Sequence, residues 1–183
     1  MPGIKGLKEF TDKENSNIYS IFGTIANLNN FEFENKEVVI IGGGAVGLDV
    51  VEFFAERGTK VSIVERLPMV GRDLDVITKI AMMDIIKKHG VKVYTNTSLM
   101  EVKENSFVVE LENKETAELK FDYGFICLGM TSEKTVLPEI EEYFGEKNIP
   151  VVNIGDSVTA RKILNGVEEG RLITNTLEKM GLF

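Results

Sequence analysis

The chain has 183 residues and a formal net charge of −8, with 43% hydrophobic and 27% charged residues. This balance predicts one globular domain, or one domain with an appended segment, that can bury a core. The acidic charge argues against nucleic-acid binding, which needs clustered lysine and arginine. Because no apolar run could span a bilayer and no signal-peptide core is present, we expect a cytoplasmic protein without membrane association.

Residue types that often carry chemistry are scarce. The one cysteine, Cys127, excludes an internal disulfide and a thiol pair, and its apolar neighbours predict a small core residue rather than a nucleophile. The one histidine, His89, precedes Gly90 at the end of an expected helix, where it would support the helix terminus. An acid-rich stretch at residues 139–146 is typical of a solvated helix face. We therefore expect no catalytic residue and no metal site in this chain.

The first half of the chain alternates strand and helix patterns. Residues 1–35 show little periodicity and are expected to form a linker, with a short helix possible at 18–28. After them, buried strands and amphipathic helices alternate at 38–41, 46–57, 61–64, 76–89 and 91–94. This β-α-β-α-β order predicts a parallel sheet, because such crossovers share one handedness.

The pattern then changes to closely spaced short strands. Residues 99–103, 106–112 and 116–121 are separated by turns so short that only antiparallel pairing fits, which predicts a β-meander. A buried strand at 123–128, a strand at 149–154 and a helix at about 159–180 complete the chain. The expected fold class is α/β, a Rossmann-like parallel sheet with helices on both faces and a three-stranded antiparallel β-meander.

A glycine motif lies between the first strand and the first helix. Gly42, Gly44 and Gly47 form G-x-G-x-x-G, in which the first permits a tight turn, the second lets backbone approach a pyrophosphate, and the third allows close helix packing. The N–H groups and dipole of the helix N-terminus would hold the phosphates, so an acidic protein can still bind them. The remaining residues expected at this cofactor site are Gly43, Ala45 and Val46.

Glu65 ends the second strand, eighteen positions after Gly47. An acid there can accept hydrogen bonds from both hydroxyls of the adenosine ribose and repels a 2′-phosphate, which favours NAD(H) over NADP(H). Arg66 leaves the alternative open, since an arginine beside the acid could accommodate that phosphate or instead cover the adenine.

Together these segments resemble the NAD(H)-binding domain of the flavoproteins with two dinucleotide-binding domains, the pyridine nucleotide–disulfide oxidoreductase superfamily. The resemblance rests on residues 38–65, the meander, and the run Phe125-Ile126-Cys127-Leu128-Gly129. Ile154-Gly155-Asp156-Ser157 and Ala160-Arg161-Lys162-Ile163-Leu164 are more narrowly similar to the C-terminal half of 2-enoate reductase and 2,4-dienoyl-CoA reductase, in the old yellow enzyme family.

The resemblance implies roles for four further residues. Asp49 falls where the superfamily often has a carboxylate near the nicotinamide carboxamide, although a polar residue on the exposed side of the helix fits equally. Gly129 falls where the chain reverses close to bound NAD. Gly155 and Asp156 fall on the motif that holds FAD by its ribitol and phosphates, and Asp156 could also cap the last helix.

The chain also departs from that family. It has one glycine motif where the family has two, and it lacks a barrel domain, iron–sulfur cysteines and a redox cysteine pair. We therefore interpret residues 36–148 as the NAD(H)-binding domain and residues 149–183 as the last strand and helix of an incomplete FAD-binding domain, with a cut or a truncated gene upstream of Met1.

The leading hypothesis is a module that binds NADH and delivers hydride to FAD, with FAD and the barrel domain present only in the intact parent enzyme. Two alternatives remain open. One is a standalone nucleotide-binding or regulatory module without turnover, and the other is FAD binding by the single glycine motif.

Overall fold

A computed structural model describes residues 3–181. The chain divides into two compact units, Met1–Gly129 and Met130–Phe183, and each is described by itself. Within the described residues, no helix is both long and apolar enough to cross a membrane.

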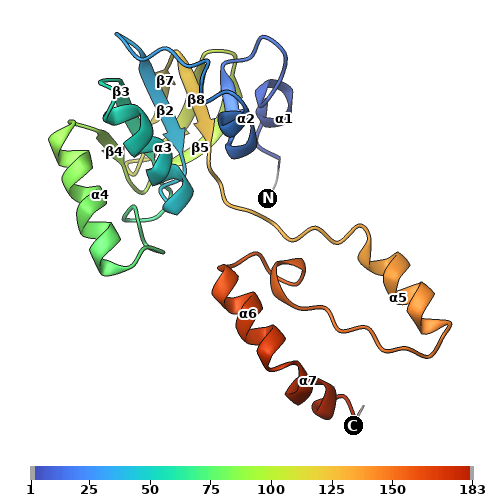
Figure 1. Ribbon diagram of the computed structural model, residues 1–183. Coiled ribbons are helices and arrows are strands. Elements are labelled where there is room, and N and C mark those ends of the chain that lie inside the picture. The colour runs from blue at the N-terminus through green and yellow to red at the C-terminus, as the bar shows by residue number, and fades with distance from the viewer. Residues whose placement is uncertain (1–2, 182–183) are drawn as a thin grey trace. The chain divides into compact units, whose positions relative to one another are not determined.

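The first unit is built on a five-stranded parallel sheet with strand order β1-β8-β2-β3-β4 (Figure 1). Val38 of the central strand pairs with Val61 on one side and Tyr123 on the other. Residues 38–41 are buried on both faces, as their continuous β-branched run predicts. The strands are β1 (Ile18–Ser20), β2 (Glu37–Ile41), β3 (Lys60–Val64), β4 (Lys92–Tyr94) and β8 (Tyr123–Ile126).

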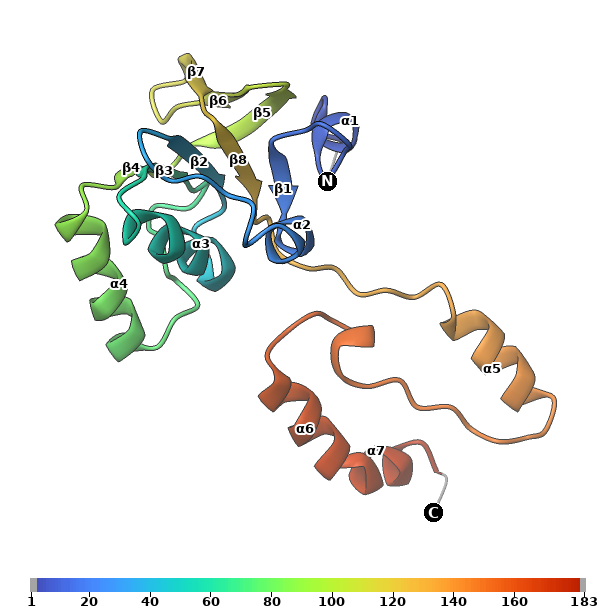
Figure 2. The same cartoon turned by 45° about the horizontal axis from the view of Figure 1, so that its top comes forward.

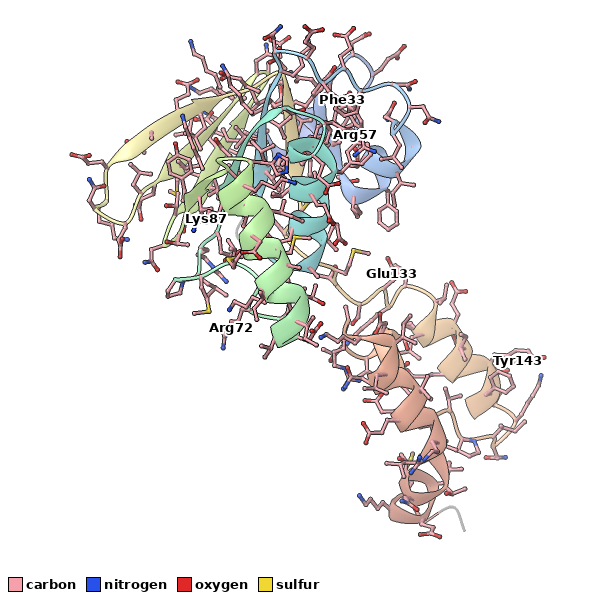
Figure 3. The ribbon with its side chains drawn as sticks, turned by 60° about the vertical axis from the view of Figure 1, so that its left-hand side comes forward. Phe33, Arg57, Arg72, Lys87, Glu133 and Tyr143 are labelled. Carbon is pink, nitrogen blue, oxygen red and sulfur yellow. The ribbon has the colours of Figure 1, made fainter. Side chains whose placement is uncertain are left out.

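Two helices pack on one face of this sheet, α3 (Ala45–Ala55) and α4 (Val76–Lys88). Phe54 of α3 is fully buried, with its ring centroid 4.9 Å from that of Phe125 on β8. On the outer side of this packing, the Arg57 guanidinium lies 4.0 Å from the Phe53 ring centroid and 5.6 Å from that of Phe33 (Figure 3). This aromatic cluster fixes α3, whose first turn carries the glycine motif.

A three-stranded antiparallel sheet covers the opposite face, with strands β5 (Ser98–Lys103), β6 (Ser106–Glu110) and β7 (Thr116–Lys120) (Figure 2). The two sheets approach closely at Gly124, where a Cβ atom would lie 2.7 Å from the Phe107 ring. Short α1 (Leu7–Phe10) adds Leu7 and Phe10 to this second core. The predicted fold class, a Rossmann-like parallel sheet with a β-meander, is confirmed.

The start of the chain differs from the expected linker with a helix at 18–28. Ile18–Ser20 forms β1, which pairs in parallel with β8 at the edge of the sheet and buries Ile18 completely. Helix α2 (Ile21–Ala26) follows, because the Ser20 side chain accepts a hydrogen bond from the Gly23 N–H at 3.3 Å and caps it. A three-residue strand has too little alternation to be predicted from sequence; its partner strand defines it.

The second unit contains α5 (Leu137–Gly145), the short 3-10 helix η1 (Gly155–Ser157), α6 (Ile163–Arg171) and α7 (Ile173–Lys179). The strand expected at 149–154 does not form, because a strand needs a neighbour and residues 130–181 contain none. The single helix expected at 159–180 is two helices that meet at Leu172. The acid-rich stretch lies on exposed α5, as predicted.

Candidate nucleotide-binding site

The glycine loop joins the carboxyl end of β2 to the first turn of α3. Gly42 has φ +108°, and a Cβ there would lie 2.1 Å from the carbonyl oxygen of Cys127. A Cβ on Gly47 would lie 1.9 Å from the carbonyl oxygen of Gly42. These two glycines are therefore required by the fold itself, by the tight turn and by the close packing of helix on strand.

Gly44 is different, because nothing in the fold requires it. Its φ of −77° suits any residue, and the nearest atom to a Cβ built there is an Asp73 carboxylate oxygen at 3.6 Å. That Cβ would project into an open cleft that Gly44 lines. Of the three motif glycines, Gly44 is thus the one whose missing side chain leaves room for a ligand rather than for the protein.

The N-terminus of α3 opens onto the same cleft. Gly44 is its N-cap residue and has no side chain to satisfy the first-turn N–H groups of this 11-residue helix. The Ala45 N–H points to Asp73, whose Oδ2 accepts it at 3.3 Å. First-turn N–H groups and the positive end of the helix dipole make this terminus suited to an anion.

Glu65 lies beside the glycine loop at the end of β3. Its Oε2 accepts a hydrogen bond from the Gly43 N–H at 2.6 Å, and its Oε1 accepts one from the Leu67 N–H at 2.7 Å. Each carboxylate oxygen has a second lone pair, so both can accept a further hydrogen bond from a ligand hydroxyl. Arg66 follows on the exposed side and lines the same cleft.

The cleft has a volume of about 490 Å³ and lies at the carboxyl ends of β2, β3 and β8. A neighbouring hollow of about 350 Å³ continues between Glu65 and Arg72, which is on the loop before α4 (Figure 3). Of the sequence-predicted residues, those that line the cleft are Gly42, Gly44, Ala45, Val46, Glu65, Arg66 and Gly129, and Gly43 lines the hollow. The structure therefore gathers the glycine loop, the acid and Gly129, whose φ is +88°, into one place, whereas Gly47 and Asp49 lie on α3 outside the cleft lining.

Cys127 lines the cleft, and Asp49 of α3 is close enough to interact with its thiol. Burial and, to a lesser extent, the Asp49 carboxylate together raise the pKa of the Cys127 thiol to about 12. The thiol therefore stays protonated near neutral pH, and Cys127, predicted to be a small core residue, is half-buried on the cleft wall rather than deep in the core. Asp49 is one turn along α3 from Ala45. Its side chain is mostly exposed, and the partial loss of its water contact raises the pKa of its carboxyl group.

Gly155 and Asp156 belong to the second unit, where they begin η1. The Gly155 N–H donates to Glu169 Oε2 at 2.6 Å, and Glu169 also pairs with Arg161. Asp156 Oδ1 accepts from the Arg161 N–H at 3.1 Å. The alternative prediction that Asp156 caps the last helix is wrong, since the N-cap of α6 is Lys162.

Several lining residues carried no sequence motif, namely Ile4, Asp73, Thr97, Ser98 and Leu99. They come from loops and strand ends that only the tertiary fold brings to the glycine loop, and periodicity does not reveal such residues. Within residues 3–181, no cluster of histidine, cysteine and carboxylate residues could hold a metal ion.

A parallel sheet with a glycine loop at its carboxyl edge, and an acid ending the next strand, defines the Rossmann-like class of α/β domains. Residues 1–154 match the family described as pyridine nucleotide-disulphide oxidoreductase, and the chain belongs to this family. Its members are oxidoreductases that use nucleotide cofactors, as the family's name states.

Similar proteins support this assignment. The chain is 28% identical over 169 residues to an "NADH oxidase" of Thermoanaerobacter brockii, covering 92% of this chain and 25% of that protein. It is 31% identical over 166 residues to a "Bilirubin reductase" of Mediterraneibacter gnavus, covering 90% and 25%. The chain thus spans about a quarter of the length of these relatives.

Solved structures show the same fold within larger chains. A 2-naphthoyl-CoA reductase complex matches with a TM-score of 0.70 at 20% identity, covering 93% of this chain and 24% of that one. Histamine dehydrogenase from Rhizobium sp. 4-9 matches with a TM-score of 0.71 at 17% identity, covering 87% and 26%.

Proposed function

We propose that residues 36–148 form the NAD(H)-binding domain of a larger FAD-dependent oxidoreductase of the 2-enoate reductase type. The observation that carries this proposal is the contact between Glu65 and the Gly43 N–H at 2.6 Å. It places an acid that can bind ribose hydroxyls directly beside a loop that can bind phosphates. NADH bound here would supply a hydride to FAD in the intact enzyme, and the name of the NADH oxidase relative supports this choice of donor.

The cleft has a suitable group for each part of NADH. The Gly44 backbone and the first-turn N–H groups of α3 would hold the pyrophosphate. The Glu65 carboxylate would accept from the ribose hydroxyls, and the hollow beside Arg72 would take the adenine. Val46 and Gly129 line the cleft and would receive the nicotinamide end, with Asp49, on the same helix as Val46, as the candidate carboxylate for the carboxamide.

The same acid favours NADH over NADPH. A 2′-phosphate would have to lie against the Glu65 carboxylate, which repels it and loses its ribose hydrogen bonds. Arg66 and Arg72 flank this carboxylate from exposed positions and would offset part of the repulsion. We assign the preference to Glu65 because its carboxylate is fixed by two backbone hydrogen bonds.

We further propose that residues 149–183 belong to the FAD-binding domain of the parent enzyme, with Gly155 and Asp156 facing FAD. The support is the exposure of apolar side chains on α6, where Ile163, Leu164 and Val167 are 86%, 73% and 61% exposed. None of residues 149–181 is buried, as expected for a segment whose packing partners belong to another domain.

Calorimetric titration of the 183-residue chain with NADH, NADPH and FAD tests this function. We expect one NADH per chain, weaker binding of NADPH, and no stoichiometric binding of FAD. Tight FAD binding with no response to NADH would instead assign the glycine loop to flavin and overturn the proposal.

A further inference from the structure

The loop between β3 and α4 holds an acidic residue against the glycine loop. The Gly71 N–H donates to the Gly43 carbonyl at 2.7 Å, and Val70 is buried beside the same glycine. Two residues after Gly71, Asp73 reaches the first turn of α3, where its Oδ2 accepts from the Ala45 N–H at 3.3 Å. The loop anchor therefore fixes where the Asp73 side chain emerges.

The Asp73 carboxylate borders the space that Gly44 leaves open. The two carboxylate oxygens lie 3.6 Å and 3.7 Å from the position that a Cβ on Gly44 would take. Asp73 also lines both the cleft and the neighbouring hollow. The Asp73 carboxylate thus lies beside the position at Gly44 where, under the proposed function, the phosphates of a dinucleotide would bind.

We propose that Asp73 sets the affinity of this site, acting as an internal anion that competes with ligand phosphates for the N-terminus of α3. This inference rests on the proposed function. A phosphate at Gly44 would need the same first-turn N–H groups and would lie within about 4 Å of the carboxylate, a separation at which like charges repel strongly near a protein surface. Asp73 must therefore swing away when a phosphate-bearing ligand binds.

The Asp73 side chain is exposed, so it has solvent on one side into which it can turn. The loop itself need not move, because the bond from Gly71 to Gly43 keeps it in place. The competition should weaken ligands that carry phosphate and leave a nucleoside unaffected.

The test compares wild type with Asp73→Asn by calorimetry at low ionic strength, using NADH, ADP and adenosine as probes. Asparagine keeps the shape and an oxygen for Ala45 but removes the charge. We expect NADH and ADP to bind about tenfold more tightly to the variant and adenosine to bind equally, with the gain shrinking at high salt. Asp84→Asn, which removes the same charge from an exposed position on α4, should change none of these affinities.

Each other outcome counts against the inference in a distinct way. If wild type binds NADH and Asp73→Asn binds it equally or more weakly, Asp73 does not compete, and the proposed function stands without it. A gain shared by adenosine or by Asp84→Asn would show a general charge effect and also overturn it. If neither protein binds NADH or ADP, the proposed function and this inference both fall. Thermal unfolding is followed throughout, and Asp73→Ser replaces the asparagine variant if that variant does not fold.

Discussion

Glu65 Oε2 accepts a hydrogen bond from the Gly43 N–H at 2.6 Å, so the acid that ends β3 is tied to the glycine loop that follows β2. The second oxygen of the same carboxylate accepts from the Leu67 N–H at 2.7 Å. One side chain therefore joins three features of the site, namely the glycine loop, the end of the neighbouring strand and the loop that carries Asp73. This arrangement makes Glu65 a structural residue as well as a candidate ligand for ribose.

Glu65→Ala is expected to affect both stability and cofactor preference. Two backbone N–H groups lose their acceptor, which should lower the free energy of unfolding by about 1–3 kcal/mol. NADH affinity should fall about tenfold, because the carboxylate that accepts from the ribose hydroxyls is lost. NADPH affinity should fall less, because the same carboxylate repels the 2′-phosphate and this repulsion is lost too. Urea unfolding and calorimetry with both nucleotides measure the two effects.

Glu104→Ala is the matched control, since Glu104 is exposed in the turn between β5 and β6. It removes the same charge and should leave stability and both affinities near their wild-type values. Retention of the full NADH preference in a folded Glu65→Ala protein would contradict the role of Glu65 and transfer the discrimination to other groups of the cleft.

The Cys127 thiol predicts an alkaline decrease in stability. Burial raises its pKa to about 12, whereas an unfolded thiol ionises near pH ~8.5. Above that lower value the unfolded chain releases the thiol proton and the folded chain does not, so rising pH favours unfolding until the folded thiol also ionises. Between about pH 8.5 and about pH 10.5, this should remove about 2–3 kcal/mol from the free energy of unfolding.

Cys127→Ala separates this effect from the titration of lysines and tyrosines, which both proteins share. Urea unfolding gives the free energy of unfolding of each protein at each pH. The value for wild type minus the value for Cys127→Ala should fall as pH rises. Parallel profiles would mean that the thiol ionises equally in both states and is not shielded as its place on the cleft wall indicates.

The sequence predicted the elements whose residues carry their own periodicity. Residues 38–41 are buried on both faces of the parallel sheet and form an uninterrupted β-branched run, and Val61, Ile63 and Val64 of the next strand are buried around half-buried Ser62. Helices α3 and α4 begin and end within two residues of their predicted bounds. Two predictions at other positions were wrong: strand β1 forms at residues 18–20, where no strand was predicted, and the strand predicted at 149–154 does not form. In both cases pairing decided the outcome, with β8 available to residues 18–20 and no strand available within residues 130–181.

For the site too, the residues of a local motif could be predicted from the sequence, and those placed by tertiary contacts could not. Gly42, Gly44 and Glu65 follow a local spacing and line one cleft, while Gly47 of the same motif packs against the Gly42 carbonyl. Asp73 could not be predicted, because its position depends on the bond from Gly71 to Gly43 rather than on a pattern around residue 73. The roles of Asp49, Gly155 and Asp156 stay predictions that the tests of cofactor binding address.

Gly124→Ala should weaken the packing of the two sheets. Its Cβ would lie 2.7 Å from a ring carbon of Phe107 and 2.8 Å from one of Phe121, and both rings are buried. Since neither ring has free space to move into, we expect a loss of about 1–3 kcal/mol in the free energy of unfolding, measured by urea denaturation. A variant as stable as wild type would mean that the antiparallel sheet shifts freely over the parallel one.

The last prediction separates the two uses of glycine in the motif. Gly47→Ala would place a Cβ 1.9 Å from the Gly42 carbonyl oxygen, forcing α3 away from β2, so it should lose about 3 kcal/mol or more of stability, or fail to fold.

Gly44→Ala places its Cβ in the cleft with no atom nearer than 3.6 Å, at a φ of −77° that alanine adopts readily. The thermal midpoint should therefore hold, while NADH affinity falls at least about tenfold because the methyl group keeps the pyrophosphate from the backbone. Adenosine, which lacks phosphate, should bind Gly44→Ala and wild type equally, and this comparison shows whether any loss arises at the phosphates. If Gly44→Ala is folded and binds NADH as tightly as wild type, the loop is only a turn between β2 and α3, and the assignment of this cleft to a dinucleotide is wrong.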